Sequence, residues 1–227
     1  MIDVVIPALN EAQALPALLG DLRDLALVRP VDVFVVDGGS SDGTGERAAA
    51  GGARLLHTSR GRANQLNAGA MAGRGDWLLF LHADSRLGRE ARGAVVAATE
   101  TEAAVEAAVF RFAIDLPGFW RRLIETGQAI REALSGLAYG DQGLLIRRRL
   151  FEEVGGYPNL PLMEDVAMIR AVRRRTRITR LPAPLVTSGR RYRHGGVMRT
   201  WLRHTALISL YLMGVSPRRL ARWRDGG

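Results

Sequence analysis

The sequence has 227 residues, of which 47% are hydrophobic and 24% are charged, and it contains no cysteine. This length and balance predict a folded chain with a sizeable core and exclude a disordered one. Without cysteine, disulfides, thiolate metal sites and cysteine nucleophiles are excluded, and nothing requires an oxidising compartment.

The basic residues are distributed unevenly. The formal net charge is +9, every basic residue is arginine, and the dense arginine clusters lie after residue 146. Such clusters are typical of a solvated face, or of a surface that meets anionic substrates or lipid headgroups. No aromatic interleaving or zinc-ligand spacing accompanies them, so the sequence predicts no nucleic-acid partner.

The first half of the chain alternates predicted strands and helices. Residues 2–7 are apolar and β-branched and end at Pro7, which predicts a buried strand. Asn10 is expected to cap the next helix, in which Leu15, Leu18, Leu19, Leu22 and Leu25 recur at helical spacing. Further strands are predicted at 31–36, 53–58 and 76–84, and helices at 42–52 and 61–75. This alternation predicts an α/β fold with a mainly parallel sheet covered on both faces.

The second half has a less regular order. Strands are predicted at 107–114, 143–148 and 177–182, the last ending at Pro182, and helices at 119–134, 150–158, 163–175 and 196–213. No linker separates the halves, so we expect one domain over residues 1–227, divided into 1–100, 101–195 and a C-terminal helix and basic tail at 196–227. No apolar stretch is long enough to span a bilayer. We expect a soluble cytoplasmic protein or one peripheral to the inner face of the membrane.

Polar and turn residues follow three of the early strands. "PALNE" follows the first, "DGGSSDGT" the second and "HAD" the fourth. In open α/β sheets ligands bind at the carboxyl ends of the strands. There Asp37 can accept hydrogen bonds from a base or ribose, and Gly38 and Gly39 let a flat ring approach. The alternative is a turn that Asp37 caps together with Ser40 and Asp42.

Five segments occur in a characteristic order: "PALNE", "VVDGGSSDGT", "GRANQLNAG", "GDWLLFLHAD" and "LPLMED". Together they resemble the family-two glycosyltransferases of the GT-A fold, from Ile2 to about Tyr192. The resemblance implies a Rossmann-like GT-A domain, α/β, with a mixed, mainly parallel sheet flanked by helices and a C-terminal helical segment. "LHADSRL", "YGDQGLLIRR" and "LPLMEDV" are further similar to a bacterial transferase subgroup associated with radical-SAM and selenium-domain proteins.

The implied activity is a metal-dependent, inverting transfer of a sugar from a nucleoside-diphosphate sugar to a hydroxyl acceptor. Residues 1–100 would be the nucleotide-binding half and 101–195 the acceptor half. The implied donor-nucleotide site consists of Pro7, Ala8, Asn10, Glu11, Asp37, Gly38, Arg62, Asn64, His82 and Ala83. In it, Asp37 would face the base and Arg62 would supply positive charge beside the diphosphate. A solvated arginine at a helix start is the alternative for Arg62.

A divalent cation, Mn²⁺ or Mg²⁺, is the implied cofactor. The resemblance makes Asp84 its ligand, because "HAD" matches the family's Asp-X-Asp. A cation there bridges the donor phosphates and steadies the leaving nucleoside diphosphate. His82 replaces the first aspartate, and Mn²⁺ tolerates an imidazole better than Mg²⁺ does. A structural role is the alternative for His82.

Glu164 and Asp165 match the family's catalytic Glu-Asp pair. Asp165 would remove the acceptor proton, and Glu164 would orient the acceptor or the helix start. The alternative is that both acids only favour the helix dipole. Asp141 and Gln142 are candidates for sugar or acceptor binding, or members of a polar turn. Arg191, Arg193 and His194 are candidates for closing over the diphosphate.

The expected partners are a UDP- or GDP-type sugar donor and a hydroxyl acceptor, with a lipid-linked acceptor, peripheral membrane contact and a homodimer as further expectations. The last helix either packs on the body or meets lipid or a second subunit, and Trp223 lies among arginines that suit a membrane anchor. Two other functions stay open. A sugar-phosphate nucleotidylyltransferase would need an early Gly-rich loop with a basic residue, which is missing, and a basic adaptor would bind lipid or protein without catalysis.

Overall fold

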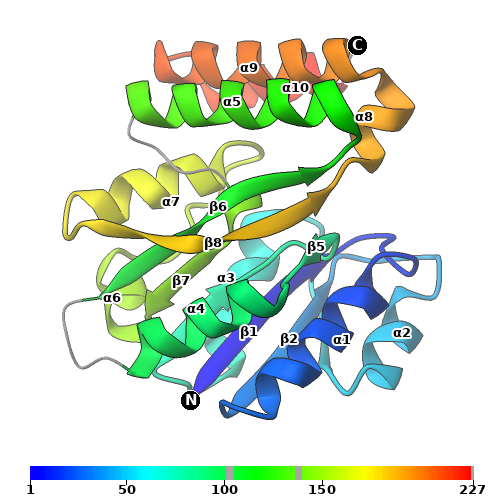
Figure 1. The fold of residues 1–227 in the computed structure, drawn as a ribbon, viewed down its shortest axis with the longest axis vertical. Coiled ribbons are helices and arrows are strands. Elements are labelled where there is room, and N and C mark those ends of the chain that lie inside the picture. The colour runs from blue at the N-terminus through cyan, green and yellow to red at the C-terminus, as the bar shows by residue number, and fades with distance from the viewer. Residues whose placement is uncertain (101–104, 136–139, 226–227) are drawn as a thin grey trace.

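The computed structural model describes residues 1–100, 105–135 and 140–225, and within them a single sheet orders its strands β3-β2-β1-β4-β7-β6-β8-β5 (Figure 1). The strands are β1 (Ile2–Ala8), β2 (Val31–Asp37), β3 (Arg54–His57), β4 (Trp77–Phe80), β5 (Ser85–Arg86), β6 (Ala107–Asp115), β7 (Leu144–Arg147) and β8 (Ile178–Ser188). Strands β1 to β4 pair in parallel, as do β6 and β8. The antiparallel pairs are β4 with β7, β6 with β7 and β5 with β8. The expected mixed, mainly parallel α/β sheet is confirmed.

Helices cover both faces of this sheet. They are α1 (Leu15–Ala26), α2 (Thr44–Ala50), α3 (Arg62–Ala72), α4 (Arg89–Glu100), α6 (Arg148–Glu153) and α7 (Glu164–Arg173). One core cluster joins α1, α2 and α4 to Ile2, Val4 and Ile6 of β1, and a second joins α3, α6 and α7 to Val5. Successive residues of a strand point to opposite faces, so a continuous apolar run fills both clusters.

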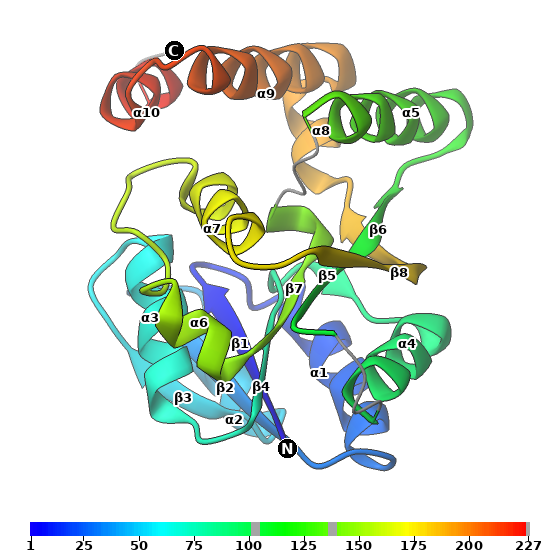
Figure 2. The same cartoon turned by 90° about the vertical axis from the view of Figure 1, so that its left-hand side faces the viewer.

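The remaining helices form a layer of their own at one end of the molecule (Figure 2). This helical layer contains α5 (Gly118–Ser135), α8 (Arg190–Gly195), α9 (Val197–Leu212) and α10 (Pro217–Asp225). A Cβ on Gly127 of α5 would lie 3.0 Å from the Trp201 ring of α9, so the two helices are in close contact. No helix in the described parts of the chain is long and apolar enough to cross a membrane.

Two local predictions at the sheet were wrong. Asn10 does not cap α1, which begins at Leu15 without a side-chain cap; Asn10 has a positive φ of 56° and holds the neighbouring loop instead. Strand β8 does not stop at Pro182 but continues to Ser188. Proline lacks an N–H and is therefore tolerated at a strand edge or bulge. Here β6 pairs one side of β8 with a register shift, and β5 pairs the other side only at Val186 and Thr187.

Strands from both sides of residue 100 enter the one sheet, since β7 lies between β4 and β6. A buried ion pair joins the same regions, with Arg148 Nη2 2.6 Å from Asp3 Oδ2. Asn67 of α3 also exchanges two hydrogen bonds with the backbone of Tyr157, at 2.8 and 2.9 Å. These contacts fix the positions of α3 and of the segment that precedes α7.

Candidate active site

The loops after β1 and β2 are held to each other by reciprocal hydrogen bonds. The Asn10 N–H donates to Ser40 Oγ at 2.9 Å, and the Ser41 N–H donates to Asn10 Oδ1 at 3.0 Å. The Asp37 carboxylate, at the end of β2, accepts from both the N–H and the hydroxyl of Ser40. Asp37 and Ser40 thus share a turn, whereas Asp42 accepts from the N–H groups of Ala12 and Thr44 instead. Asp37 lies at the carboxyl edge of the sheet, and its role toward a nucleoside stays a prediction.

Gln65 of α3 lies beneath these loops and was missed in the sequence. Its buried amide donates to the Ala8 carbonyl at 2.8 Å and to the Val36 carbonyl at 2.7 Å. A Cβ on Gly38 would lie 3.1 Å from that amide nitrogen, so this position has little room for a larger residue. The helix also contains Arg62, Asn64, Asn67 and Met71, so a glutamine at position 65 gave no distinct signal in the sequence.

Glu11 is connected to the C-terminal part of the chain. Its carboxylate lies 2.7 Å from Arg190 Nη2 of α8, and its N–H donates to Thr44 Oγ1 at 2.9 Å. The hydrogen bond to Glu11 raises the pKa of the Arg190 guanidinium, and the Asp84 charge adds to this effect. Arg190 thus connects α8 to the nucleotide-side loop.

His82 and Asp84 follow β4, which ends at Phe80 and not at residue 84 as expected. Burial lowers the pKa of His82 well below its usual range, with Arg62 and Arg191 adding to the shift, so the imidazole is neutral. The Asp84 carbonyl accepts from the Ser188 N–H at 3.2 Å, which fixes this loop to β8.

His82 and Asp84 are the candidate ligands of a divalent cation. Among the described residues, no three His, Asp or Glu side chains lie close enough to hold a metal by themselves. A cation on a nucleotide, however, commonly uses one or two carboxylates and takes its other ligands from phosphates and water. A neutral imidazole at His82 and a partly exposed carboxylate at Asp84 fit that requirement.

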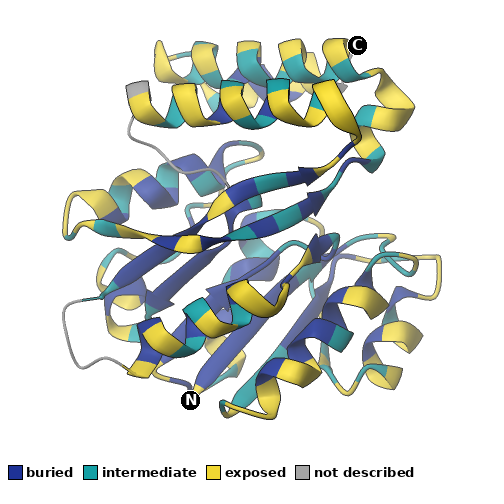
Figure 3. Ribbon diagram, in the orientation of Figure 1, coloured by how far each residue is buried: buried dark blue, intermediate teal, exposed yellow. Residues whose placement is uncertain are grey.

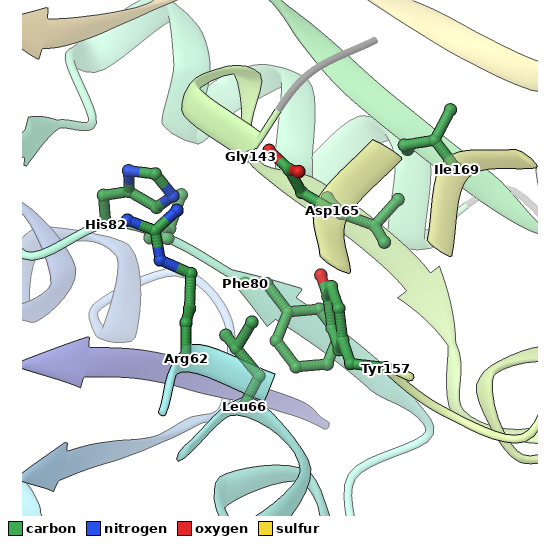
Figure 4. A pocket seen from close by; sticks show the side chains of 10 residues that line it. Arg62, Leu66, Phe80, His82, Gly143, Tyr157, Asp165 and Ile169 are labelled. Atoms are coloured by element: carbon green, nitrogen blue, oxygen red, sulfur yellow. The ribbon is translucent and has the colours of Figure 1, made fainter. Parts of the chain in front are cut away.

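A pocket lies between His82 and the start of α7 (Figure 4), and Asp84 is not among the residues that line it. It is lined by Arg62, Leu66, Phe80, Leu81, His82, Gly143, Leu144, Tyr157, Asp165 and Ile169. Figure 4 shows the Arg62 guanidinium beside the His82 ring, with the Tyr157 hydroxyl and the Asp165 carboxylate across from them. Tyr157 was not among the predicted site residues, because its place depends on the contact with Asn67.

The two acids at the start of α7 have different surroundings. Glu164 is buried, and its Oε1 lies 3.5 Å from Arg62 Nε. Burial raises the pKa of Glu164, whereas the Arg62 charge lowers it and the Asp165 charge raises it further. Asp165 lines the pocket, and its Oδ1 accepts from the Val166 N–H at 2.8 Å.

Asp141 and Gln142 separate in the structure. Gln142 is fully buried, and its amide donates to the Phe110 carbonyl at 3.1 Å and to Glu132. Asp141 lies near Asp165, and burial followed by that charge raises the pKa of Asp141 to about 6. Its buried Oδ1 has no hydrogen-bond partner among the described residues. The structure therefore brings Asp141 toward the pocket and gives Gln142 internal partners.

The other predicted residues lie around the same edge. Pro7 and Ala8 end β1, Asn64 donates to Ser59 Oγ at 3.4 Å, and Ala83 is buried. In α8, Arg193 donates to the Asp115 carbonyl at 2.8 Å. Arg191 is exposed on the same helix, close enough to His82 for its charge to act on the imidazole, and His194 is also exposed.

An open α/β sheet that gathers charged side chains at the carboxyl ends of its strands defines a class of ligand-binding folds. The model of glycosyl transferase family 2 matches residues 3–156, which is more than half of the chain. The protein belongs to this family. No curated protein matches its sequence.

Solved structures share the fold at low sequence identity. Glucosyl-3-phosphoglycerate synthase from Mycobacterium tuberculosis, in complex with phosphoglyceric acid, is 20% identical with a TM-score of 0.60, over 82% of this chain and 70% of that one. The mannosyltransferase PcManGT from Pyrobaculum calidifontis, in complex with GDP-Man and Mn²⁺, is 20% identical with a TM-score of 0.60, over 82% and 56%. S. aureus TarS 1-349, in complex with UDP-GlcNAc, is 17% identical with a TM-score of 0.61, over 82% and 58%. The chain thus has the GT-A fold and spans only part of each of these proteins.

Proposed function

We propose that this protein transfers one sugar from a nucleoside-diphosphate sugar to a hydroxyl acceptor, with inversion at the anomeric carbon. The observation that carries the proposal is the pocket in which Asp165 lies across from Arg62 and His82. It combines a carboxylate that can accept a proton with positive charge on the side expected for a diphosphate. Membership of glycosyl transferase family 2 supports the same reaction.

The donor is expected to lie along the carboxyl ends of β1, β2 and β4. Asp37 would accept hydrogen bonds from the nucleoside, and the reciprocal contacts of Asn10 with Ser40 and Ser41 hold its loop in place. The similar structures contain UDP-GlcNAc or GDP-Man, and this supports a UDP- or GDP-type donor.

His82 and Asp84 would hold a divalent cation against the donor phosphates, and the Mn²⁺ of PcManGT supports this assignment. When bound, the cation would stabilise the charge that develops on the leaving diphosphate. Arg62, at the start of α3, would also stabilise the negative charge on the leaving diphosphate. Its contact with Glu164 is 3.5 Å long, and the Arg62 side chain is 36% exposed, so a diphosphate can compete for the guanidinium.

Asp165 would accept the proton of the acceptor hydroxyl while that oxygen attacks the anomeric carbon. A bond from this oxygen to the sugar forms as the bond to the phosphate oxygen breaks, and the electron pair leaves with the nucleoside diphosphate. One displacement inverts the anomeric carbon and forms no covalent sugar-enzyme intermediate. Asp141, next to Asp165, would hold the acceptor hydroxyl.

Several narrower assignments stay predictions. They are the bacterial subgroup associated with radical-SAM and selenium-domain proteins, the division into a nucleotide half at 1–100 and an acceptor half at 101–195, a lipid-linked acceptor and a homodimer. Residues 101–104 and 136–139, which belong to the proposed acceptor half, lie outside the described residues.

Thermal unfolding with UDP, GDP, CDP or ADP, each with and without Mn²⁺, tests the donor site. A nucleotide at about 100 times its dissociation constant stabilises the native state by roughly 2.7 kcal/mol. We expect a Mn²⁺-dependent increase in Tm for UDP or GDP that is lost in Asp37→Ala and Asp84→Ala. Asp76→Ala, an exposed acid before β4 at the opposite edge of the sheet, is the control and should keep the increase. No shift with any nucleotide would overturn the proposal.

A further inference from the structure

The outer side of α9 and the residue that follows the helix expose large apolar side chains in a row. Met198 and Leu202 share one side of α9, and Met213 lies directly after its end; Leu202 and Met213 are 53% and 72% exposed. Ala206 and Ser209 interrupt this row. Isolated exposed apolar residues are ordinary, so the inference depends on the basic residues that accompany them.

Arginines border this row and continue onto α10. Arg199 and Arg203 each follow an apolar member of the row by one position, and no Asp or Glu occurs between Val197 and Arg224. The Arg203 guanidinium donates to the Arg224 carbonyl, which places the basic side of α9 against the end of α10. We call the combined surface the C-terminal basic face: Met198, Arg199, Leu202, Arg203, Met213, Arg218, Arg219, Arg222 and Trp223.

Helix α10 presents a mixed basic and aromatic side. Leu220 and Ala221 are buried, whereas Arg218, Arg222 and Trp223 are exposed, the last by 57%. Figure 3 shows the exposed outer sides of the helical layer at one end of the molecule. Arginine on the polar side and tryptophan at the boundary are the composition of helices that lie in a membrane interface.

We propose that the C-terminal basic face binds the surface of an anionic lipid bilayer. The arginines would contact lipid phosphates, and the methionines, Leu202 and Trp223 would enter the boundary between headgroups and acyl chains. A second copy of the chain suits this face less well, because a two-fold contact would bring the same unneutralised arginines together.

The helices that carry this face pack against α7. Leu207 of α9 and Leu220 of α10 belong to the same core cluster as Val166 of α7. Binding through this face would therefore hold the start of α7 close to the bilayer. The inference concerns binding alone and does not depend on the reaction proposed above.

Vesicle sedimentation in the absence of nucleotide tests the inference. We expect binding to phosphatidylcholine vesicles that contain phosphatidylglycerol, little binding to phosphatidylcholine alone, and weaker binding as salt is raised. Arg218→Gln with Arg222→Gln should weaken partitioning about 30-fold, since each arginine near an anionic surface contributes roughly a factor of five. Arg74→Gln with Arg89→Gln removes the same charge from exposed positions of the α/β body and should change vesicle partitioning little.

A second pair of variants separates lipid insertion from charge attraction. Leu202→Ser with Met213→Ser keeps every arginine and should still weaken binding to anionic vesicles. Equal binding to both vesicle types, or an equal loss in the two arginine pairs, would overturn the proposal. A dimer detected by light scattering and broken by Arg218→Gln with Arg222→Gln would instead assign the face to a second copy.

Discussion

Single residues at the start of α7 differ in what surrounds them. Glu164 is buried against Arg62, whereas Asp165 lines the pocket. Glu164 is not among the residues that line the pocket, and its carboxylate is directed to Arg62, so an acceptor hydroxyl in the pocket meets Asp165 first. The neighbouring Asp165 has the position that proton transfer requires.

Asp165→Asn should lower the transfer rate by about 10²–10⁴-fold, the usual contribution of a positioned general base. Donor binding should persist, because Asp165 is not expected to contact the nucleotide. The measurement is the steady-state rate together with the Tm increase from nucleotide and Mn²⁺, and NMR of the product gives its anomeric configuration.

Glu164→Gln is the matched comparison and should lower the transfer rate less than Asp165→Asn does. Equal losses in the two variants, or a retained anomeric configuration in the wild-type product, would contradict the assignment of Asp165 as the base.

The free energy of unfolding should depend on pH through the protonation of Asp141. Its pKa is raised from 3.8 to about 6, so the native state holds this proton more tightly than the unfolded chain does. The Asp141 contribution to the free energy of unfolding is therefore full below pH 3.8 and falls as the pH rises to about 6. Urea unfolding across this range should show Asp141→Asn becoming stabilised relative to wild type as the pH rises.

The stability contribution of His204, which lies in α9 of the helical layer, has the opposite pH dependence. Burial, with Arg191 and Arg131 adding to it, lowers its pKa from 6.5 to about 4, so its contribution is lost as the pH falls from 6.5 to about 4. His204→Gln should accordingly become stabilised relative to wild type as the pH falls. The same trend in both variants would show that neither residue causes the change in the free energy of unfolding with pH.

At the scale of elements, the fit of α3 on the sheet depends on one helical glycine. A Cβ on Gly69 would lie 2.4 Å from Val5 Cγ1 and 3.0 Å from Val36 Cγ2. We expect Gly69→Ala to lower the free energy of unfolding by about 1–2 kcal/mol, because the clash exceeds the helix-propensity gain of alanine.

Gly20→Ala is the control in α1, where nothing lies within 4 Å of the added Cβ. It should raise stability by up to about 1 kcal/mol in the same urea titration. Destabilisation of similar size in both variants would mean that the contact with β1 and β2 is not the cause.

The elements that the sequence predicted well are those with a strong period or a clear end. Strands β1, β2 and β6 and helices α1 and α5 lie where the apolar pattern predicted them, and α3 lies where a segment rich in small residues predicted a helix. The order of five short motifs also led correctly to the family. Helix α10 was expected only as a basic tail, because its apolar contact is limited to Leu220 and Ala221.

Features that depend on distant contacts could not be predicted. The passage of β8 through Pro182 depends on which edge is left unpaired, and the use of Asn10 as a loop clamp depends on Ser40 and Ser41. Tyr157 and Gln65 entered the site through hydrogen bonds to segments far along the chain. Local patterns contain no information about such partners.

Over the whole molecule, the ion pair of Asp3 with Arg148 connects the first strand to the segment after β7. Asp3 is fully buried, and its Oδ2 also accepts from the Gly75 N–H at 2.6 Å. We expect Arg148→Met to lower the free energy of unfolding by about 3–5 kcal/mol, because it leaves a buried carboxylate without its partner.

Arg149→Met tests the same change one position later. Arg149 is exposed and pairs with Glu106 at 3.2 Å, so its loss should cost less than about 1 kcal/mol. Chemical unfolding followed by fluorescence and by circular dichroism measures both variants. A similar loss in the free energy of unfolding in both variants would show that the ion pair of Asp3 with Arg148 does not strongly connect β1 to the segment after β7.

The short pairing of β5 with β8 has a consequence for the growing chain on the ribosome. Strands β1 to β4 can pair once residue 80 has emerged, and the loops that hold Asp37 form with them. The loop of Asp84 is held on one side by Arg86 and Leu87, which bond to Asp21 of α1. Its contacts with Val186 to Ser188 form with residues that are synthesised much later. Because pairing between distant segments is slow, the nascent protein should acquire its nucleoside loops early and the β8 contacts of the Asp84 loop only after residue 188 has emerged.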